Sequence, residues 1–460
     1  MSLIKSISGI RGTIGGKVDE NLTPLDIVKF SAAFGTWLQT NKNKKNLTIV
    51  VGRDARISGK MVNSLVCATL QGLGINVIDL GLSTTPTVEI MVPELNADGG
   101  IILTASHNPK EWNALKLLNE KGEFINSENG ADVLKLAEDE SFSFAEVDDL
   151  GTYEERNDAF DIHIQQILNL PMVDVKAIKA KNYKIVLDAV NSTGGIAIPM
   201  LLEKLGCETI KLYCEPNGQF PHNPEPLKEH LGDICALVKS EKADLGIVVD
   251  PDVDRLALVD ENGDLFGEEY TLVAVADYLL KNKKGVAISN LSSSRALRDI
   301  AKNHGSEYFA SAVGEVNVVN LMKEKNAVIG GEGNGGIIYP DLHFGRDSLV
   351  GVALFLTHLA KENKSVSELR SSYPSYFMGK KKIQLTPEID VDALLTKMEK
   401  EYQNEEVSTV DGVKIDFEKN WVHLRKSNTE PIIRIYTEAF SQEEADDLGD
   451  KMIEKIKSLV

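Results

Sequence analysis

Three aspartates occupy alternate positions in the stretch DPDVDR, residues 250–255, directly after an apolar run. In an extended backbone alternate side chains point the same way, so Asp250, Asp252 and Asp254 are expected to converge. Carboxylates that close repel one another by roughly 4 kcal/mol per pair at an effective dielectric of about 20, and a divalent cation removes this repulsion. Oxygen ligands select Mg²⁺, Ca²⁺ or Mn²⁺ over zinc or copper. The stretch predicts a cation site; the alternative is a charged turn, because Asp and Pro are common in turns.

A second candidate, Ser106, lies in TASHNPKEWNALK, residues 104–116, where an apolar run gives way to a polar loop. Adjacent serine and histidine side chains diverge, and no G-x-S-x-G elbow surrounds Ser106, so a hydrolase pair is not expected. We therefore expect His107 to shape the loop by hydrogen bonding. A phosphorylated Ser106 would supply strong acceptor oxygens that complete a magnesium shell begun by the aspartates. An unmodified loop serine is the alternative, and the combination with residues 250–255 favours the phosphoserine.

Two further stretches indicate groups for a phosphorylated sugar. RKSNTEPIIR, residues 425–434, combines arginine, hydroxyl and amide groups that suit a phosphate monoester, although a surface turn is an equal alternative. GGEGNGG, residues 330–336, follows a strand, but Glu332 would repel a phosphate, so a dinucleotide-binding fingerprint fits poorly. Glu332 and Asn334 suit sugar hydroxyls better.

The elements that must position these residues follow an α/β pattern. Thr23 is a plausible N-cap with Pro24 at the first helical position, and Ser441 with Glu444 forms a capping box before a C-terminal helix. Alternating strands and helices predict mainly parallel sheets, whose carboxyl ends carry ligand-binding loops. Strands are expected at residues 47–54, 183–191, 244–252 and 327–336, each ending in polar or glycine-rich turns.

Composition narrows the class of protein. A chain of 460 residues predicts three or four domains, and 42% hydrophobic with 26% charged residues is typical of a globular protein. The net charge of −19 argues against nucleic acid or an anionic membrane as a partner. The four cysteines show no CxxC pairing, so we expect no zinc site. Neither a signal peptide nor a run of about 18 apolar residues is found, which predicts a cytoplasmic protein.

Taken together, the sequence resembles the α-D-phosphohexomutase family over nearly its whole length. The resemblance rests on six stretches in the family's order: SGIRG (8–12), VGRDAR (51–56), TASHNPKEWNALK (104–116), DPDVDR (250–255), GGEGNGG (330–336) and RKSNTEPIIR (425–434). It implies an α/β fold of four domains around a central cleft, three related mixed α/β domains and a smaller C-terminal α+β domain. The expected domains are 1–152 with the phosphoserine loop, 153–255 with the metal-binding loop, 256–372 with the sugar-binding loop and 373–460 with the phosphate-binding loop.

The resemblance also implies a role for each candidate residue. Ser106 is the phosphoserine and binds Mg²⁺ together with the three aspartates. Arg11, Lys116 and Arg255 surround the phosphoryl group in transit. The expected substrate-binding residues, with His107 included, are His107, Glu332, Asn334, Arg425, Ser427, Asn428, Thr429 and Arg434.

The implied reaction interconverts hexose 6-phosphate and hexose 1-phosphate, with hexose 1,6-bisphosphate as intermediate and activator. We expect a small-molecule sugar phosphate as partner, a monomer or homodimer, and movement of the fourth domain. Glucosamine phosphate is the favoured substrate, followed by glucose and mannose phosphates. Many family members have histidine where this chain has Gly336, and Asn-Gly where it has Asn113-Ala114. Without that histidine, Lys116 or Glu315 is the candidate base.

Two rival hypotheses remain open. A phosphatase of the haloacid-dehalogenase type would use Asp250 as its nucleophile and would leave residues 425–434 unexplained. A catalytically silent sugar-phosphate binding protein would retain ligand affinity without Ser106.

Overall fold

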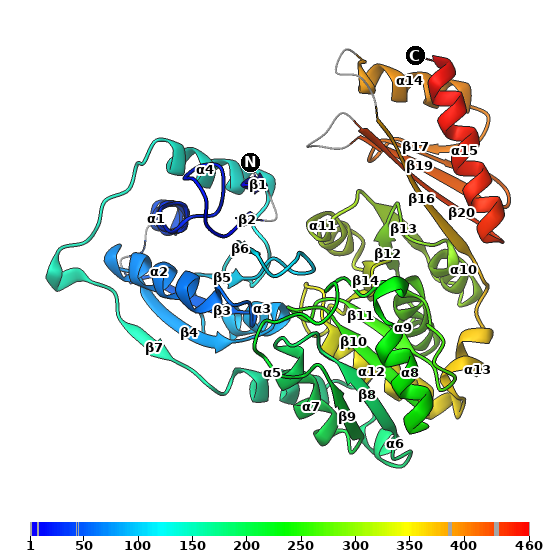
Figure 1. Cartoon of the computed structure of the whole chain (residues 1–460), viewed down its shortest axis with the longest axis horizontal. Coiled ribbons are helices and arrows are strands. Elements are labelled where there is room, and N and C mark those ends of the chain that lie inside the picture. The colour runs from blue at the N-terminus through cyan, green and yellow to red at the C-terminus, as the bar shows by residue number, and fades with distance from the viewer. Residues whose placement is uncertain are drawn as a thin grey trace. The chain divides into compact units, whose positions relative to one another are not determined.

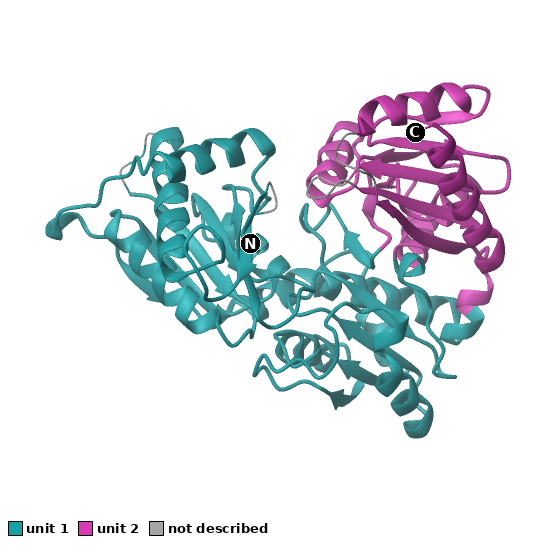
Figure 2. Cartoon of the chain, turned by 45° about the horizontal axis from the view of Figure 1, so that its top comes forward, with its two compact units in different colours: residues 1–271, 334–368 teal, residues 272–333, 369–460 magenta. Residues whose placement is uncertain are grey.

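The computed structural model describes residues 2–6, 9–42, 44, 46–384, 389–426 and 432–459. They form two compact units, which are coloured separately in Figure 2. Unit 1 comprises residues 1–271 and 334–368, and unit 2 comprises residues 272–333 and 369–460.

The N-terminal part of unit 1 is a mixed seven-stranded sheet with the order β1-β2-β6-β5-β3-β4-β7 (Figure 1). Its centre, β5-β3-β4, is parallel, whereas β1, β2 and β6 pair antiparallel. The strands are β1 (Ile4–Ser6), β2 (Gly9–Thr13), β3 (Thr48–Arg53), β4 (Asn76–Leu82), β5 (Gly99–Leu103), β6 (Trp112–Leu118) and β7 (Tyr153–Glu155).

Helices cover both faces of this sheet because its central strands are apolar on both sides. In β3, Ile49 and Val51 face one core with α1 (Pro24–Lys42), α2 (Gly59–Gly72) and α4 (Ser127–Glu138). Val50 faces a second core with α3 (Thr85–Glu94) and α5 (Ala159–Leu168). Helix α1 begins at Pro24, as predicted, and Asp26 accepts a hydrogen bond from the Thr23 backbone N–H at 3.0 Å.

Unit 1 contains a second sheet with the order β11-β10-β8-β9. Strands β8, β9 and β10 are parallel, and β11 pairs antiparallel with β10. A buried helix, α12, packs against α5, α6 and α7. The elements are β8 (Lys184–Asp188), β9 (Glu208–Leu212), β10 (Leu245–Val249), β11 (Leu256–Val259), α6 (Val175–Lys179), α7 (Gly194–Lys204), α8 (Gly232–Glu241) and α12 (Ser348–Glu362), with short 3₁₀ turns at Val147–Asp149 and Lys228–His230. Unit 1 also contains the short strand β15 (Gly336–Ile338), which is not part of this sheet.

Unit 2 begins with the parallel strands β13, β12 and β14 and ends with an antiparallel sheet of order β16-β20-β19-β18-β17. Helices α14 and α15 share a core with that antiparallel sheet. The bounds are β12 (Ala287–Asn290), β13 (Tyr308–Ser311), β14 (Ile329–Glu332), β16 (Phe377–Gln384), β17 (Glu406–Ser408), β18 (Val413–Asp416), β19 (Trp421–Lys426), β20 (Ile432–Ala439), α9 (Glu268–Asn282), α10 (Ala296–Asn303), α11 (Glu315–Lys325), α13 (Val366–Ser371), α14 (Val391–Glu401) and α15 (Gln442–Leu459).

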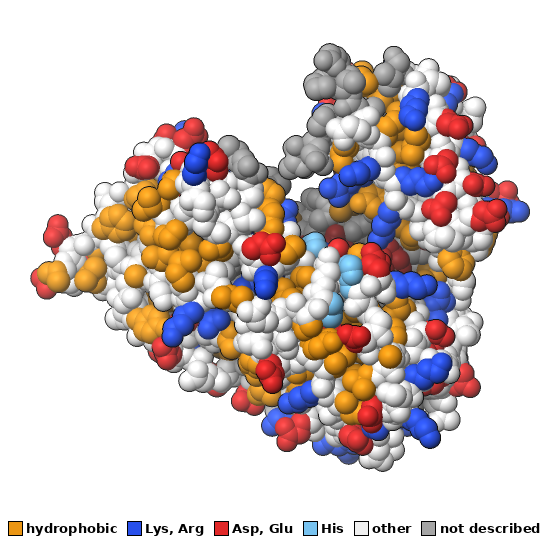
Figure 3. All heavy atoms as spheres, viewed as in Figure 1, with side chains coloured by type: hydrophobic (Ala, Val, Ile, Leu, Met, Phe, Trp, Pro, Cys, Tyr) orange, Lys and Arg blue, Asp and Glu red, His pale blue; other side chains and the backbone are white. Residues whose placement is uncertain are grey.

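The predicted α/β class with a smaller C-terminal α+β part is confirmed, and the four expected strands are β3, β8, β10 and β14. The capping side chain of Ser441 accepts from the Glu444 N–H at 3.2 Å, as expected. The expectation of mainly parallel sheets is wrong for the first sheet's antiparallel side and for the whole C-terminal sheet. Among the described residues, no helix combines the length and apolarity that a membrane crossing requires. On the face in Figure 3, acidic and basic side chains are interspersed among apolar ones.

Candidate active site

The central feature of unit 1 is a hydrogen bond between loops distant in the sequence. Ser106 follows β5, and its hydroxyl donates to Asp250 Oδ2 at 2.9 Å across 144 positions of the chain. Ser106 is 8% exposed, and its φ of +48° lies in the left-handed region, which L-residues rarely adopt. The convergence of these two stretches is therefore confirmed.

The three aspartates form the one cluster of at least three metal-ligating side chains found among the described residues. One ligand atom from each of Asp250, Asp252 and Asp254 lies within 4.8 Å of the other two, and all three residues are buried. The predicted reason was wrong, however. Strand β10 ends at Val249, and residues 250–254 form a turn in which the buried Val253 has a φ of +65°. The turn, not an extended strand, brings the carboxylates together.

Asp252 and Asp254 each have one carboxylate oxygen held by the protein and the other left for a ligand. Asp252 Oδ2 accepts from Thr85 Oγ1 at 2.6 Å and from Lys116 Nζ at 2.7 Å. Asp254 Oδ2 accepts from Arg346 Nη2 at 2.6 Å. The Oδ1 atoms of Asp252 and Asp254 are buried and have no hydrogen-bond partner among the described residues. Unpaired buried carboxylate oxygens are costly, and a cation bound to them would remove that cost.

The charge balance of the cluster also favours a cation. Burial, together with the neighbouring Asp254 and Asp252, raises the pKa of Asp250 well above its usual range. Burial alone would raise the pKa of Asp252, but the Lys116 ammonium lowers it below its usual range. A divalent cation would allow all three carboxyls to ionise, and an oxygen-only donor set suits Mg²⁺, Ca²⁺ or Mn²⁺. The residues present therefore fit such a metal.

Arg56, in the loop after β3, holds the Ser106 loop in place. Its guanidinium donates to four backbone carbonyls of that loop, and its Nε donates to Asp54 at 2.9 Å. The four acceptors are the carbonyls of Ser106 (2.5 Å), Pro109 (2.6 Å), Asn108 (2.7 Å) and Trp112 (3.0 Å). The Arg56 side chain is 0% exposed. We missed this role in the sequence, where Arg56 ends the stretch VGRDAR without a visible partner.

His107 lies beside the serine, with its Nδ1 3.4 Å from Ser106 Oγ. Burial, and then the positive charge of Arg255, lowers the pKa of His107 to about 3. An imidazole with so low a pKa is neutral near pH 7 and accepts a proton poorly. The geometry agrees with a residue that shapes the loop rather than one that activates Ser106.

Arg11 and Lys116 lie on neighbouring strands of the first sheet. Arg11 in β2 stands opposite Ala114 in β6, so Lys116, two residues further on, shares its face. Arg11 Nε is buried without a hydrogen-bond partner among the described residues. Arg255 also has a buried, unpartnered Nε, while its Nη1 contacts Glu225 at 3.1 Å. Cationic donors with free hydrogens suit a phosphoryl group.

Unit 2 contains the predicted sugar-binding carboxylate. Glu332, at the end of β14, accepts from Asn290 Nδ2 at 2.8 Å and from the Gly314 N–H at 3.1 Å. Glu315 opens α11 directly after Gly314. Asn334 falls in unit 1, where its Oδ1 accepts from the Gly336 N–H at 3.2 Å.

The described residues of the predicted phosphate-binding stretch, 425–426 and 432–434, lie at the facing ends of β19 and β20. Arg425 and Arg434 stand directly opposite each other in the antiparallel register. Like charges at such positions repel, so an anion between them would be stabilising. Arg425 is balanced in part by Asp411, which accepts from its Nε at 2.8 Å, whereas Arg434 is exposed. Ser427, Asn428 and Thr429, predicted for the same role, lie outside the described residues.

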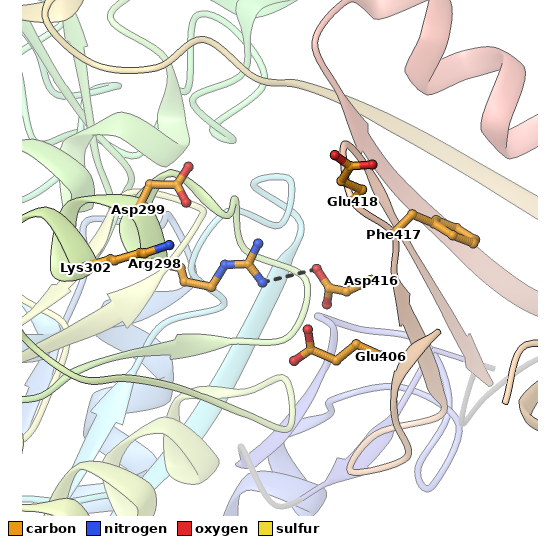
Figure 4. A pocket seen from close by; sticks show the side chains of 7 residues that line it. All are labelled: Arg298, Asp299, Lys302, Glu406, Asp416, Phe417 and Glu418. Atoms are coloured by element: carbon orange, nitrogen blue, oxygen red, sulfur yellow. Dashed lines mark hydrogen bonds and ion pairs between the residues drawn. The ribbon is translucent and has the colours of Figure 1, made fainter. Parts of the chain in front are cut away.

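A separate pocket of about 400 Å³ lies in unit 2 between α10 and the C-terminal sheet (Figure 4). Arg298 points across it toward Asp416, with an ion-pair distance of 3.4 Å. The other lining residues are Asp299, Lys302, Glu406, Phe417 and Glu418. None of these lining residues was predicted as a site residue, and they do not combine a nucleophile with a cluster of metal ligands. The Ser106 and aspartate cluster of unit 1 is therefore a stronger candidate for the active site than this pocket.

Four family models match consecutive parts of the chain. The phosphoglucomutase/phosphomannomutase alpha/beta/alpha domains I, II and III match residues 3–144, 161–263 and 267–376. The C-terminal domain of the same family matches residues 382–455. Together these matches cover most of the chain in the family's order.

Whole-chain relatives carry two kinds of name. A phosphoglucomutase/phosphomannomutase of Thermococcus kodakarensis is 38% identical over 96% of this chain and 98% of that protein. A phosphoglucosamine/phosphogalactosamine mutase of Sulfurisphaera tokodaii is 33% identical over 98% of each chain. The crystal structure of a phosphoglucomutase/phosphomannomutase family protein from Burkholderia thailandensis superposes with a TM-score of 0.86 at 25% identity, over 99% of this chain and 98% of that one.

Proposed function

The chain belongs to the phosphoglucomutase/phosphomannomutase family of isomerases, and we propose that it interconverts hexose 6-phosphate and hexose 1-phosphate through a phosphorylated Ser106. The observation that carries this proposal is the hydrogen bond from Ser106 Oγ to Asp250. Two further carboxylate oxygens of the cluster have no hydrogen-bond partner within the part of the chain that the structure describes. A serine in that place lies beside carboxylates that would bind a divalent cation.

The metal site follows from the same residues. Asp250, Asp252 and Asp254, with a phosphate on Ser106, would hold Mg²⁺. The metal supplies positive charge that stabilises the phosphoryl oxygens during transfer. Lys116 contributes an ammonium fixed by Asp252, and Arg11 and Arg255 contribute guanidinium donors for the same oxygens.

The chemical step is a transfer between oxygens. A sugar hydroxyl attacks the phosphorus, and the new O–P bond forms as the bond to Ser106 Oγ breaks. The hydroxyl proton passes to a base, and Ser106 Oγ takes up a proton, so the serine hydroxyl is restored. The candidates for this base are Lys116, whose Nζ donates to Asp252 at 2.7 Å, and Glu315. The resulting hexose 1,6-bisphosphate then returns its other phosphoryl group to Ser106, which restores the enzyme and releases the isomer.

The binding roles are distributed over both units. Glu332 and Asn334 hold sugar hydroxyls, and Arg425 with Arg434 holds the phosphate that is not reacting, together with Ser427, Asn428 and Thr429. His107 supports the loop that presents Ser106. The proposed domains are 1–152, 153–255, 256–372 and 373–460, each carrying one of these loops.

We propose glucosamine phosphate as the preferred substrate, which the mutase of Sulfurisphaera tokodaii supports by name. Glucose and mannose phosphates form the second candidate, which the more similar relative from Thermococcus kodakarensis favours. A coupled assay of glucosamine 6-phosphate, glucose 1-phosphate and mannose 1-phosphate, each with a trace of the bisphosphate, decides between them. The proposal expects the highest kcat/KM for glucosamine 6-phosphate; equal or higher values for the other two would overturn the preference.

The same assay addresses the rival functions. A phosphatase would release inorganic phosphate without forming the isomer. A silent binding protein would bind the sugar phosphates with no turnover at all.

A further inference from the structure

We propose that Arg346 is a positioning residue that makes the metal site selective for a small cation. It holds one carboxylate oxygen of Asp254, so that only the other oxygen can bind the metal. This inference rests on the proposed function, since it assumes that the aspartate cluster binds a divalent metal. Arg346 is 8% exposed and donates from Nη2 to Asp254 Oδ2 at 2.6 Å. Lys116, the other cation near that oxygen, is 3.9 Å away, so Arg346 is its principal partner.

The backbone fixes Arg346 beside the metal-binding turn. Arg346 is bridged in antiparallel fashion to Ile338, and the Asp347 N–H donates to the Ile337 carbonyl at 2.8 Å. The next residue, Ser348, donates from its N–H to the Val253 carbonyl within the turn at 3.1 Å. The guanidinium therefore approaches Asp254 from an anchored segment.

Gly336 leaves the space through which the Arg346 side chain passes. A Cβ built at position 336 would lie 2.3 Å from Arg346 Cδ and 3.0 Å from its Cγ. Arg346 stands opposite Ile338, so the two side chains lie on the same face of this short ladder. Residue 336 is two positions before Ile338 and therefore lies on that face too. Only glycine accommodates the arginine in this conformation.

The consequence concerns how Asp254 binds a metal. With Oδ2 held by Arg346, only Oδ1 is available, and that atom has no partner among the described residues. Mg²⁺ and Mn²⁺ favour octahedral sites with one oxygen per carboxylate, whereas Ca²⁺ accepts bidentate carboxylates and higher coordination. Removing Arg346 would free both oxygens and make the site more tolerant of Ca²⁺.

The test measures binding of Mn²⁺ to the purified full chain by electron paramagnetic resonance, with Ca²⁺ as competitor. We expect the preference for Mn²⁺ over Ca²⁺ to fall about tenfold in Arg346→Met, the size of one charge-assisted hydrogen bond. Arg346→Lys should keep part of the preference, because an ammonium can still donate to Oδ2. Arg298→Met, in unit 2, is the matched control and should match the wild type.

Gly336→Ala provides an independent perturbation of the same contact. It should reduce the preference for Mn²⁺ in the wild-type background and change nothing further when Arg346 is already Met. If Arg346→Met keeps the wild-type preference for Mn²⁺ while Asp252→Asn loses Mn²⁺ as expected, only the role of Arg346 is overturned. Equal Mn²⁺ binding by Asp252→Asn and the wild type overturns the metal site itself, and with it the proposed function.

Discussion

The hydroxyl of Ser106 lies 2.9 Å from Asp250 Oδ2, although the two residues follow strands of different sheets and are 144 positions apart. Both residues occupy tight turns, and each turn contains a residue with positive φ, Ser106 itself and Val253. Such strained backbone persists where the surrounding contacts impose it. The pairing of a nucleophilic oxygen with a cation site is what the proposed chemistry requires.

Asp252→Asn should lower kcat at least about 100-fold, because the amide cannot supply the charge that a metal and the transferred phosphoryl group need. The fold should persist, since asparagine keeps the shape and can still accept from Thr85. Turnover measured with saturating substrate, alongside a thermal melt, checks both parts.

The control for this change is Asp416→Asn, which removes a carboxylate from the Arg298 ion pair in unit 2. It should leave kcat near the wild-type value. An Asp252→Asn enzyme that keeps most of its turnover would contradict the metal assignment.

Removal of the metal with a chelator should abolish turnover and lower the melting temperature. Three buried carboxylates then face one another with only Lys116 and Arg346 to offset their charge. Free Mg²⁺ at 100 times its Kd would stabilise the folded protein by about 2.7 kcal/mol. Differential scanning calorimetry with and without Mg²⁺ checks the shift. An identical melting temperature in both conditions would argue that the cluster holds no cation.

Arg425→Ala and Arg434→Ala should each weaken sugar-phosphate binding by about 1.5–3 kcal/mol, the worth of a hydrogen bond to a charged group. This corresponds to a KM raised by roughly tenfold or more, with a smaller change in kcat. The Arg298→Ala variant, another arginine of unit 2 outside the predicted site, should keep the wild-type KM. Equal KM values for all three variants would remove the phosphate role from residues 425–434.

Acid should destabilise the C-terminal sheet through His423. The residue is 0% exposed, its Nδ1 pairs with Ser292 Oγ at 2.9 Å, and its Nε2 donates to the Asp411 carbonyl at 2.6 Å. Burial lowers the pKa of His423 to about 4, from an ordinary value of 6.5. The unfolded chain therefore takes up a proton near pH 6.5 and the folded chain only near pH 4. About 3 kcal/mol of stability, present above pH 6.5, is lost as the pH falls from 6.5 to 4.

The measurement compares thermal melts of the wild type and His423→Gln at pH 7 and at pH 4. The wild type should lose more stability than the variant over this range, because glutamine does not titrate. The same loss in both proteins would show that His423 does not govern the acid response.

The sequence predicted which side chains converge better than it predicted the backbone that brings them together. Spacing alone identified the three aspartates, but the turn that aims them depends on contacts of Thr85 and Ser348 with residues 252 and 253. These contacts come from helices distant in the chain, so no local pattern indicates them. The extended-strand argument therefore reached a correct conclusion for a wrong reason.

Arg56 and Arg346 were missed because a buried arginine looks like any other arginine in a sequence. Each is recognised only from its partners, four loop carbonyls for Arg56 and Asp254 for Arg346. One signal was present: the glycine at position 336 leaves the space that the Arg346 side chain fills.

The most direct test of the account is to locate the phosphate after incubation of the enzyme with glucose 1,6-bisphosphate. Tandem mass spectrometry of proteolytic peptides should find one acid-stable phosphoryl group on Ser106, and glucose 6-phosphate should discharge it. A hydroxylamine-labile phosphate on Asp250, or no phosphate on Ser106 in an enzyme that turns over, would contradict the account.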